Sequence, residues 1–187
     1  MKVVVILGSS RDGRMGERVS KLVMTEANKF ENWDVELVDL AKIDLPMYHD
    51  ANLPSMMNEK YNDKTVTEWS SVVKSADAFI VLTPEYNHSI PAVLKNAIDW
   101  LYGEWGNKAA GIVSYSMAPY GGARAVEHLR NILARLAVAT VQTSTSIGSV
   151  HESISENGEP VSDGVIATLR AEFAQVDSWA TALKTTR

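Results

Sequence analysis

The chain has 187 residues, 45% of them hydrophobic, which is enough for one domain (residues 1–187) with a substantial core and leaves little room for a second independent domain. Its net charge of −5, without any run of lysine or arginine, argues against nucleic acid or an anionic membrane as the main partner. It contains no cysteine, which excludes disulfides, thiolate nucleophiles and cysteine metal sites and agrees with a cytoplasmic protein.

The N-terminal apolar run is expected to be a strand and not a targeting segment. KVVVIL, from Lys2 to Leu7, is rich in β-branched residues and unbroken, which is typical of a strand covered on both faces. A signal peptide would need a longer apolar region. No apolar segment of the chain approaches the ~20 residues that a membrane-spanning helix requires.

Short apolar runs alternate along the chain with stretches whose apolar residues recur at helical spacing. The short runs predict five strands, over residues 2–7, 33–38, 78–82, 108–115 and 139–144. The other stretches predict five helices, within residues 19–30, 58–75, 90–101, 126–136 and 166–183. This alternation is typical of βαβ units, so we predict an α/β three-layer sandwich with a five-stranded parallel sheet in its middle layer.

Three loops of the predicted sheet are candidates for a ligand site. In sheets of this kind, ligands bind in the crevice beyond the carboxyl ends of the strands. The loops that follow the first, third and fourth strands are also the richest in Gly, Ser, Asn and Arg. They are Gly8–Gly16, Thr83–Pro91 and Ser114–Gly122.

The first of these loops, GSSRDGRMG, is suited to a single phosphate group. Its glycines allow close approach to an anion, helix N-terminal amides can point at it, and Arg11 or Arg14 could neutralise it. It lacks the lysine of a P-loop, the glycine spacing of a dinucleotide fingerprint and the paired acids of a receiver domain. The alternative is a glycine-rich turn with solvated arginines.

The second loop, LTPEYNHSIP, carries polar groups that suit a flat ligand. Two prolines stiffen it, Glu85 and Asn87 can engage a ring edge, and Tyr86 offers a face and a hydroxyl. The alternative is that Asn87 or Ser89 merely caps the next helix. In the third loop, SYSMAPYGG, small residues would admit a ring across the strand ends, although glycine and serine are also ordinary turn residues.

Taken together, the three loops resemble those of the NADPH-dependent FMN reductase family. The resemblance rests on GSSR, TPEYNHSIPAVLKNAIDWL and GGARAVEHLR, and it covers nearly the whole chain. It implies a flavodoxin-like fold, non-covalent FMN, and NADPH or NADH as electron donor. Hydride would pass through FMN, in a ping-pong scheme, to a small-molecule electron acceptor such as a quinone, an azo compound, chromate or free flavin.

The resemblance also implies roles for particular residues, none of which is catalytic because FMN does the chemistry. Ser9 and Arg11 would hold the phosphate of FMN. Many members carry a further serine or asparagine late in the first loop, where this chain has RMGE, so Arg14 or the amide of Gly16 is expected to replace that contact. The ring would be held by Pro84, Glu85, Tyr86 and Asn87 and bordered by Ser114, Tyr115 and Gly122.

Family members are usually dimers or tetramers, so the resemblance implies a homodimer or homotetramer. Trp100, Tyr102 and Trp105 follow the third predicted helix; core packing could use one or two of them, and we interpret the cluster as part of a subunit interface. The four histidines show no metal-ligand spacing, and we interpret His88 as solvated.

Two other function classes remain open from the sequence. One is a flavodoxin-like electron-transfer protein that docks to redox partners, for which this chain is only mildly acidic. The other is a flavin-free interaction or sensing protein on the same fold, since a fold does not fix a function.

Overall fold

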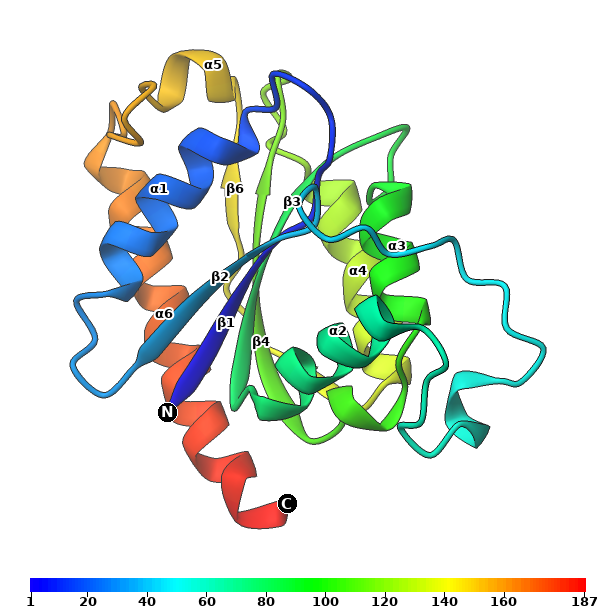
Figure 1. Cartoon of the computed structure of the whole chain (residues 1–187). Coiled ribbons are helices and arrows are strands. Elements are labelled where there is room, and N and C mark those ends of the chain that lie inside the picture. Colours follow the sequence, from blue (N-terminus) through cyan, green and yellow to red (C-terminus); the bar gives the residue numbers. More distant parts are fainter.

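The computed structural model describes all residues from 1 to 187 and shows a parallel β-sheet between two layers of helices (Figure 1). The strands are β1 Lys2–Leu7, β2 Asp34–Asp39, β3 Ala78–Pro84, β4 Lys108–Tyr115, β5 Val138–Thr140 and β6 Thr145–Ile147. The helices are α1 Gly16–Ala27, α2 Lys64–Ser75, α3 Ala92–Asp99, α4 Ala123–Arg135, α5 Val150–Ser153 and α6 Asp163–Leu183. Short 3-10 turns lie at Pro54–Met56, Gly103–Trp105 and Lys184–Thr186.

The strand order of the sheet is β2-β1-β3-β4-β5, and every pairing is parallel. The chain runs from β1 outward to β2 and then returns to the other side of β1 as β3. The direction of winding therefore changes between β1 and β3. A crevice at the carboxyl ends of these two strands is where this topology places a ligand.

The predicted five-stranded sheet is confirmed, and its fifth position is shared by two short strands. β5 pairs with the start of β4 and β6 with its end. Between them, the amide of Thr143 donates to Gln175 Oε1 at 3.0 Å, and Gln175 Nε2 donates to Thr143 Oγ1 at 2.7 Å. Because α6 satisfies these groups, the polar segment leaves the sheet and the strand is interrupted.

Each face of the sheet has its own core. Val4 and Ile6 of β1 pack with α2, α3 and α4, whereas Val3 and Val5 pack with α1 and α6. All four side chains are at most 1% exposed, as the unbroken apolar run predicts for a strand covered on both sides. Figure 1 shows α1 and α6 on one side of the sheet and the other three long helices opposite.

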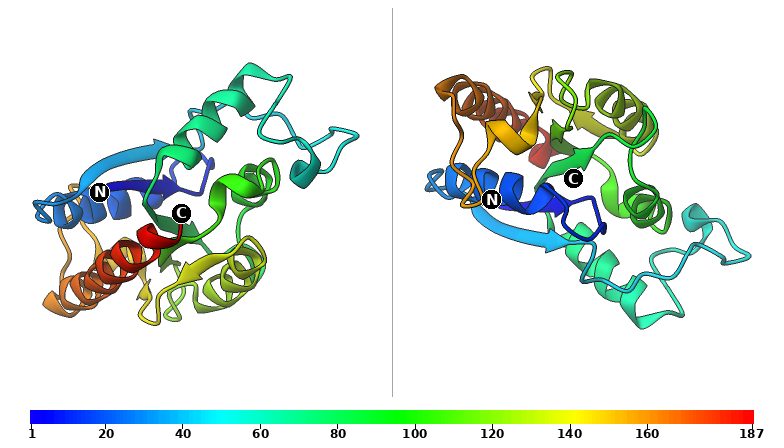
Figure 2. Two further views of the ribbon diagram at one scale, coloured as in Figure 1. Left: turned by 90° about the horizontal axis from the view of Figure 1, so that it is seen from below. Right: turned by 90° about the horizontal axis from the view of Figure 1, so that it is seen from above.

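Residues 41–63 form an extended segment, here called the arm, which leaves the body of the protein beside α3 (Figure 2). Part of it was expected to be helical, but α2 begins only at Lys64. The reason is Asp63, whose carboxylate accepts a hydrogen bond from the amide of Val66 at 3.0 Å and so caps the helix start. Just before this cap, Asn58 and Glu59 adopt left-handed φ values of 50° and 59°, which end any regular helix.

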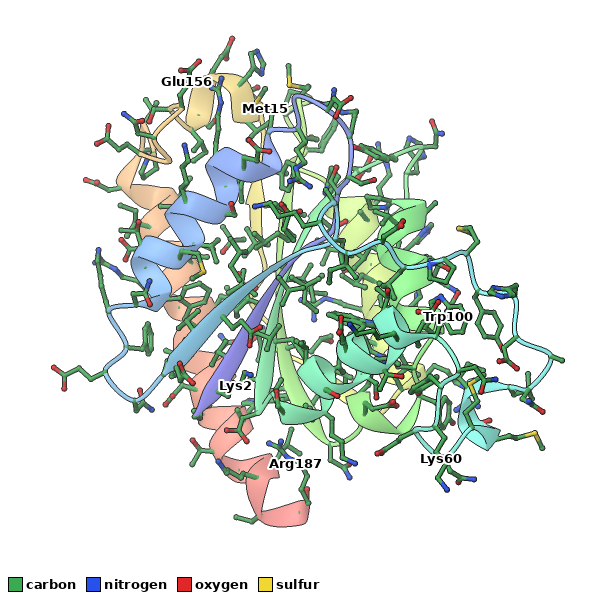
Figure 3. All side chains as sticks on the ribbon, in the orientation of Figure 1. Lys2, Met15, Lys60, Trp100, Glu156 and Arg187 are labelled. Atoms are coloured by element: carbon green, nitrogen blue, oxygen red, sulfur yellow. The ribbon has the colours of Figure 1, made fainter.

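Two of the three aromatic residues assigned to an interface belong to the core of this chain. Trp105 is 1% exposed, and its ring centroid lies 5.9 Å from that of Trp69. Trp100 is 3% exposed and donates from Nε1 to the carbonyl oxygen of Pro46 at 2.7 Å, which fastens the arm to α3 (Figure 3). The interpretation of these tryptophans as interface residues is therefore wrong, since internal packing already covers them.

None of the helices combines the length and the apolar character that crossing a bilayer demands.

Candidate functional site

The three loops predicted to form a site surround one cavity of about 260 Å³ beyond the carboxyl ends of β1, β3 and β4. Met15, at the start of α1, marks this end of the molecule in Figure 3. The lining residues are Ser9, Arg11, Arg14 and Met15 from the first loop, Pro84, Glu85 and Tyr86 from the second, Tyr115, Ser116, Met117, Ala118 and Tyr120 from the third, and Arg124 and Val150 beyond it.

The first loop leaves β1 in close contact with β3. A Cβ on Gly8 would lie 2.8 Å from the carbonyl oxygen of Leu82, and the Gly8 amide donates to that oxygen at 2.9 Å. Ser9 follows, fully buried, with its Oγ 3.0 Å from the hydroxyl of Tyr86. Arg11, by contrast, is exposed and makes one long bond of 3.4 Å to the carbonyl oxygen of Asp12. Arg11 is thus the cation at the cavity that remains available to an anion.

Arg14 stands at the same cavity but is held by the protein. Its Nη2 lies 2.6 Å from Asp39 Oδ2 at the end of β2, and its Nη1 donates to the carbonyl oxygen of Ser9. Burial disfavours the charge, but the bond to Asp39 outweighs it, so the pKa of Arg14 is raised. The expected role of Arg14 as a free phosphate contact does not match this pairing. The guanidinium of Arg14 joins the first loop to Asp39 at the end of β2. From the sequence alone, Asp39 was not identified as a partner of this loop.

Gly16 and Tyr115 meet beneath the first loop. Gly16 opens α1, and a Cβ there would overlap the hydroxyl of Tyr115, so only glycine fits. Tyr115 is 3% exposed, and its hydroxyl has no hydrogen-bond partner. The start of α1 therefore packs tightly against the ends of β1 and β4, with an unsatisfied hydroxyl at the contact.

Glu85 is committed to the protein rather than turned to a ligand. Its Oε1 accepts from Arg124 Nη1 at 2.9 Å and its Oε2 accepts from the Arg124 amide at 3.1 Å. Burial of Glu85 opposes ionisation, but these bonds outweigh it and lower the pKa of the carboxyl. An ionised carboxylate at the N-terminus of α4 is favoured by the helix dipole. The expected contact of Glu85 with a ring edge is thus replaced by a cap that joins the second loop to α4.

Tyr86 to Ser89 form a tight turn at the tip of the second loop. The amides and carbonyl oxygens of these two residues bond reciprocally, at 2.9 and 3.0 Å. Asn87 and His88 between them have φ values of 50° and 66° and are exposed. Asn87 therefore sets the turn and does not line the cavity. Ser89 lies 3.0 Å from His128 Nδ1, and α3 has no side-chain cap, so the alternative in which Asn87 or Ser89 caps that helix is wrong.

Ser114 and Gly122 support the cavity from behind. Ser114 is fully buried with its Oγ 3.0 Å from Ser146 Oγ on β6. Gly122 has a left-handed φ of 86° and lies where a Cβ would be 3.1 Å from that of Ser114. Neither lines the cavity, so their expected contact with a ring is not what the structure shows. Met117 and Tyr120, which are 57% and 70% exposed, form the rim instead.

Several lining residues were not among those predicted. Tyr120 and Met117 lie inside the third loop, so their place in it could have indicated them. Arg124 and Val150 reach the cavity from α4 and α5, and no local pattern marks them. No group of three or more His, Cys, Asp or Glu side chains is arranged to hold a metal ion.

The sequence was compared with known proteins. Residues 1–152 match the family of NADPH-dependent FMN reductases. The chain belongs to this family. The NAD(P)H-dependent FMN reductase LOT6 of Saccharomyces cerevisiae is 32% identical over 197 residues, which cover 100% of this chain and 99% of the relative. The quinone reductase of Escherichia coli K12 is 32% identical over 180 residues, 92% of each chain.

The fold shows the same relationship. FerB, a flavoenzyme NAD(P)H:(acceptor) oxidoreductase from Paracoccus denitrificans, superposes with a TM-score of 0.74 at 25% identity, covering 98% of this chain and 97% of FerB. The predicted flavodoxin-like fold is confirmed. As an FMN reductase, the chain is an oxidoreductase that uses FMN and NAD(P)H, and the matched relatives give no support to the electron-carrier alternative.

The residues present fit a flavin nucleotide. Met15, at the start of α1, lines the cavity, and Gly13 just before it has open space where a side chain would stand, as an anion site at a helix N-terminus requires. The free guanidinium of Arg11 supplies a charge at the same place. The buried hydroxyl of Tyr115 has no hydrogen-bond partner inside the protein, so a bound ligand could supply one.

Proposed function

We propose that this FMN reductase delivers electrons from NADPH or NADH to a small flat acceptor of the quinone kind, with azo compounds, chromate and free flavin as further candidates. The observation that carries the proposal is a single cavity with a cationic end at Arg11 and an exposed rim of Met117 and Tyr120. The charged end suits a phosphate, and the rim suits an aromatic or apolar molecule above a ring. The quinone reductase of E. coli supports this acceptor class.

In this proposal the side chains bind and orient, and FMN, when bound, supplies the transfer of hydride and electrons. Ser9 and Arg11 hold the phosphate, while Pro84 and Tyr86 flank the ring. Glu85, the one acid that lines the cavity, keeps the second loop on α4 through Arg124 and so leaves no free carboxylate to act as a base. Backbone donors of the loops would stabilise negative charge on the ring of bound FMN.

The decisive experiment is to purify the protein, titrate it with FMN and follow NADPH and NADH oxidation with a quinone. Binding of FMN together with quinone-dependent oxidation is the expected result. A protein that takes up no FMN would overturn the proposed site, and FMN uptake without NAD(P)H oxidation would favour the electron-transfer alternative.

Arg11→Ala tests the phosphate assignment. A hydrogen bond from a charged group contributes roughly 1.5–3 kcal/mol, so the Kd for FMN should rise by about one to two orders of magnitude. The matched control is Lys64→Ala, which removes a charge that is 90% exposed at the start of α2 and does not line the cavity. Equal FMN affinity in all three proteins would remove Arg11 from the site.

We also propose a cytoplasmic homodimer or homotetramer. The absence of cysteine supports the compartment. A second, largely apolar hollow of about 520 Å³ lies between α3, α4 and the arm, with Ile98 and Ile132 in its wall and Lys95, Asp99 and Arg135 beside them. Charges of both signs around an apolar centre suit a self-complementary interface. Ile132→Glu is expected to lower the mass measured by light scattering, and an unchanged mass would place the interface elsewhere.

A further inference from the structure

The unpartnered hydroxyl of Tyr115 is the polar group of the site that the protein itself leaves unexplained. Tyr115 is 3% exposed, and its oxygen has no hydrogen-bond partner in the structure. A buried donor without a partner costs roughly 1–3 kcal/mol. Such a group is retained at a binding site where a ligand satisfies it.

The position of the hydroxyl shows which part of a ligand it would meet. Tyr115 ends β4, and its hydroxyl packs on the α carbon side of Gly16, in the space that any larger residue would fill. Gly16 is the first residue of α1, and Met15 before it lines the cavity together with Ser9 and Arg11. The hydroxyl therefore lies beside the helix N-terminus, with Tyr86 of the second loop also near it.

The chemistry of the hydroxyl suits an anion. Burial raises the pKa of Tyr115, and the nearby Tyr86 adds to this effect. The hydroxyl therefore keeps its proton at neutral pH. It would be stabilised by donating a hydrogen bond to an acceptor. Arg11 and Arg14 lie close enough to influence its charge, so an acceptor placed there is in a positive field.

The other side chain available at this point is already in use. Arg14 would have to leave Asp39, at 2.6 Å, and the carbonyl oxygen of Ser9 to bind a ligand fully. We infer that the Tyr115 hydroxyl, seated on Gly16, donates a hydrogen bond to the phosphate of the flavin nucleotide and takes the place of the polar side chain missing late in the first loop. This inference rests on the proposed FMN site and reassigns Tyr115 from the ring to the phosphate.

Tyr115→Phe tests the inference, because it removes one oxygen atom and keeps the ring that packs in the core. The test compares Kd values for FMN and riboflavin, which differ by the phosphate alone, by quenching of flavin fluorescence. The variant is expected to bind FMN about tenfold more weakly than the wild type, one hydrogen bond being worth about this factor, and to bind riboflavin unchanged. Its apo form should unfold at the same or a higher temperature, since no bond is lost.

The matched control is Tyr61→Phe, which deletes a hydroxyl that donates to Glu104 Oε1 at 2.5 Å and does not line the cavity, and it should leave both Kd values unchanged. Equal FMN affinity in Tyr115→Phe and the wild type would overturn the inference. Equal loss for FMN and riboflavin would also overturn it, because it would place the hydroxyl at the ring or the sugar chain. In either case FMN binding by the wild type still decides the proposed function separately.

Discussion

Arg14 and Asp39 form the ion pair that fixes the first loop of the site. Both side chains are largely buried, at 7% and 11% exposed, and their atoms lie 2.6 Å apart. Asp39→Asn leaves the guanidinium buried with its charge uncompensated, so we expect a loss of about 2 kcal/mol in the free energy of unfolding, together with weaker FMN binding. Urea denaturation measures the first and flavin titration the second.

Asp34→Asn is the control for this prediction, because it makes the same change at the exposed start of the same strand. It should alter stability by less than about 0.5 kcal/mol. Equal effects of the two substitutions would mean that the pair contributes nothing specific to the loop.

Glu172 gives a pH-dependent prediction at the same scale. It lies on α6, fully buried, with Oε2 bonded to the amide and hydroxyl of Thr145 and Oε1 without a partner. Burial raises its pKa to about 8, although the Thr145 bonds and the charge of Arg130 oppose the rise. The folded state therefore holds a proton that the unfolded chain releases near its ordinary pKa of 4.5.

Because the folded state binds the extra proton, stability should fall as the pH rises from about 5 to 8, by on the order of 1 kcal/mol per pH unit at the steepest point, and then level off. Glu172→Gln keeps an acceptor for Thr145 but has no proton to lose. Urea denaturation at pH 5, 6.5 and 8 should show a smaller decline in the variant than in the wild type. Parallel declines would show that other groups cause the pH dependence.

At the scale of elements, Glu85 joins the second loop to the first turn of α4. Glu85→Gln removes the charge at the helix N-terminus and the ion pair with Arg124, so about 1 kcal/mol of stability should be lost. Amide hydrogen exchange should speed up in the first turn of α4 more than in its last turn. The control is Glu127→Gln, which makes the same change at an exposed site on the same helix. If Glu85→Gln did not speed up exchange in the first turn of α4 more than Glu127→Gln does, the capping role would be contradicted.

Much of the element pattern could be predicted from local sequence. β1 and β4 have the predicted bounds because their apolar runs are unbroken, and the three loops chosen by the strand-end rule line one cavity. The interruption before β6 could not be predicted, because Gln175 of α6 causes it from 32 residues away. Partners in the site are also far apart along the sequence: Arg14 is 25 residues from Asp39, and Glu85 is 39 residues from Arg124. No local pattern reveals such pairs, which is why both charged groups were assigned to the ligand.

At the scale of the whole molecule, a bound flavin should stabilise the fold, because the cavity joins segments from both halves of the chain. A ligand present at 100 times its Kd adds about 2.7 kcal/mol, which for a domain of this length raises Tm by about 5–10 °C. Scanning calorimetry with and without FMN measures the shift. At the same FMN concentration Arg11→Ala should show a smaller shift, and an equal one would contradict its role.

The interrupted strand also bears on how the protein avoids unwanted contacts. An exposed sheet edge is a template on which another chain can extend the sheet and start an aggregate. Here one edge consists of β5 and β6, with three residues each, and the other is β2, where Asp34 and Glu36 carry charge. Neither edge therefore presents a long strand without charged side chains to which another chain could add. Self-association is thereby steered away from the sheet and toward helical surfaces, where contacts can be specific and reversible.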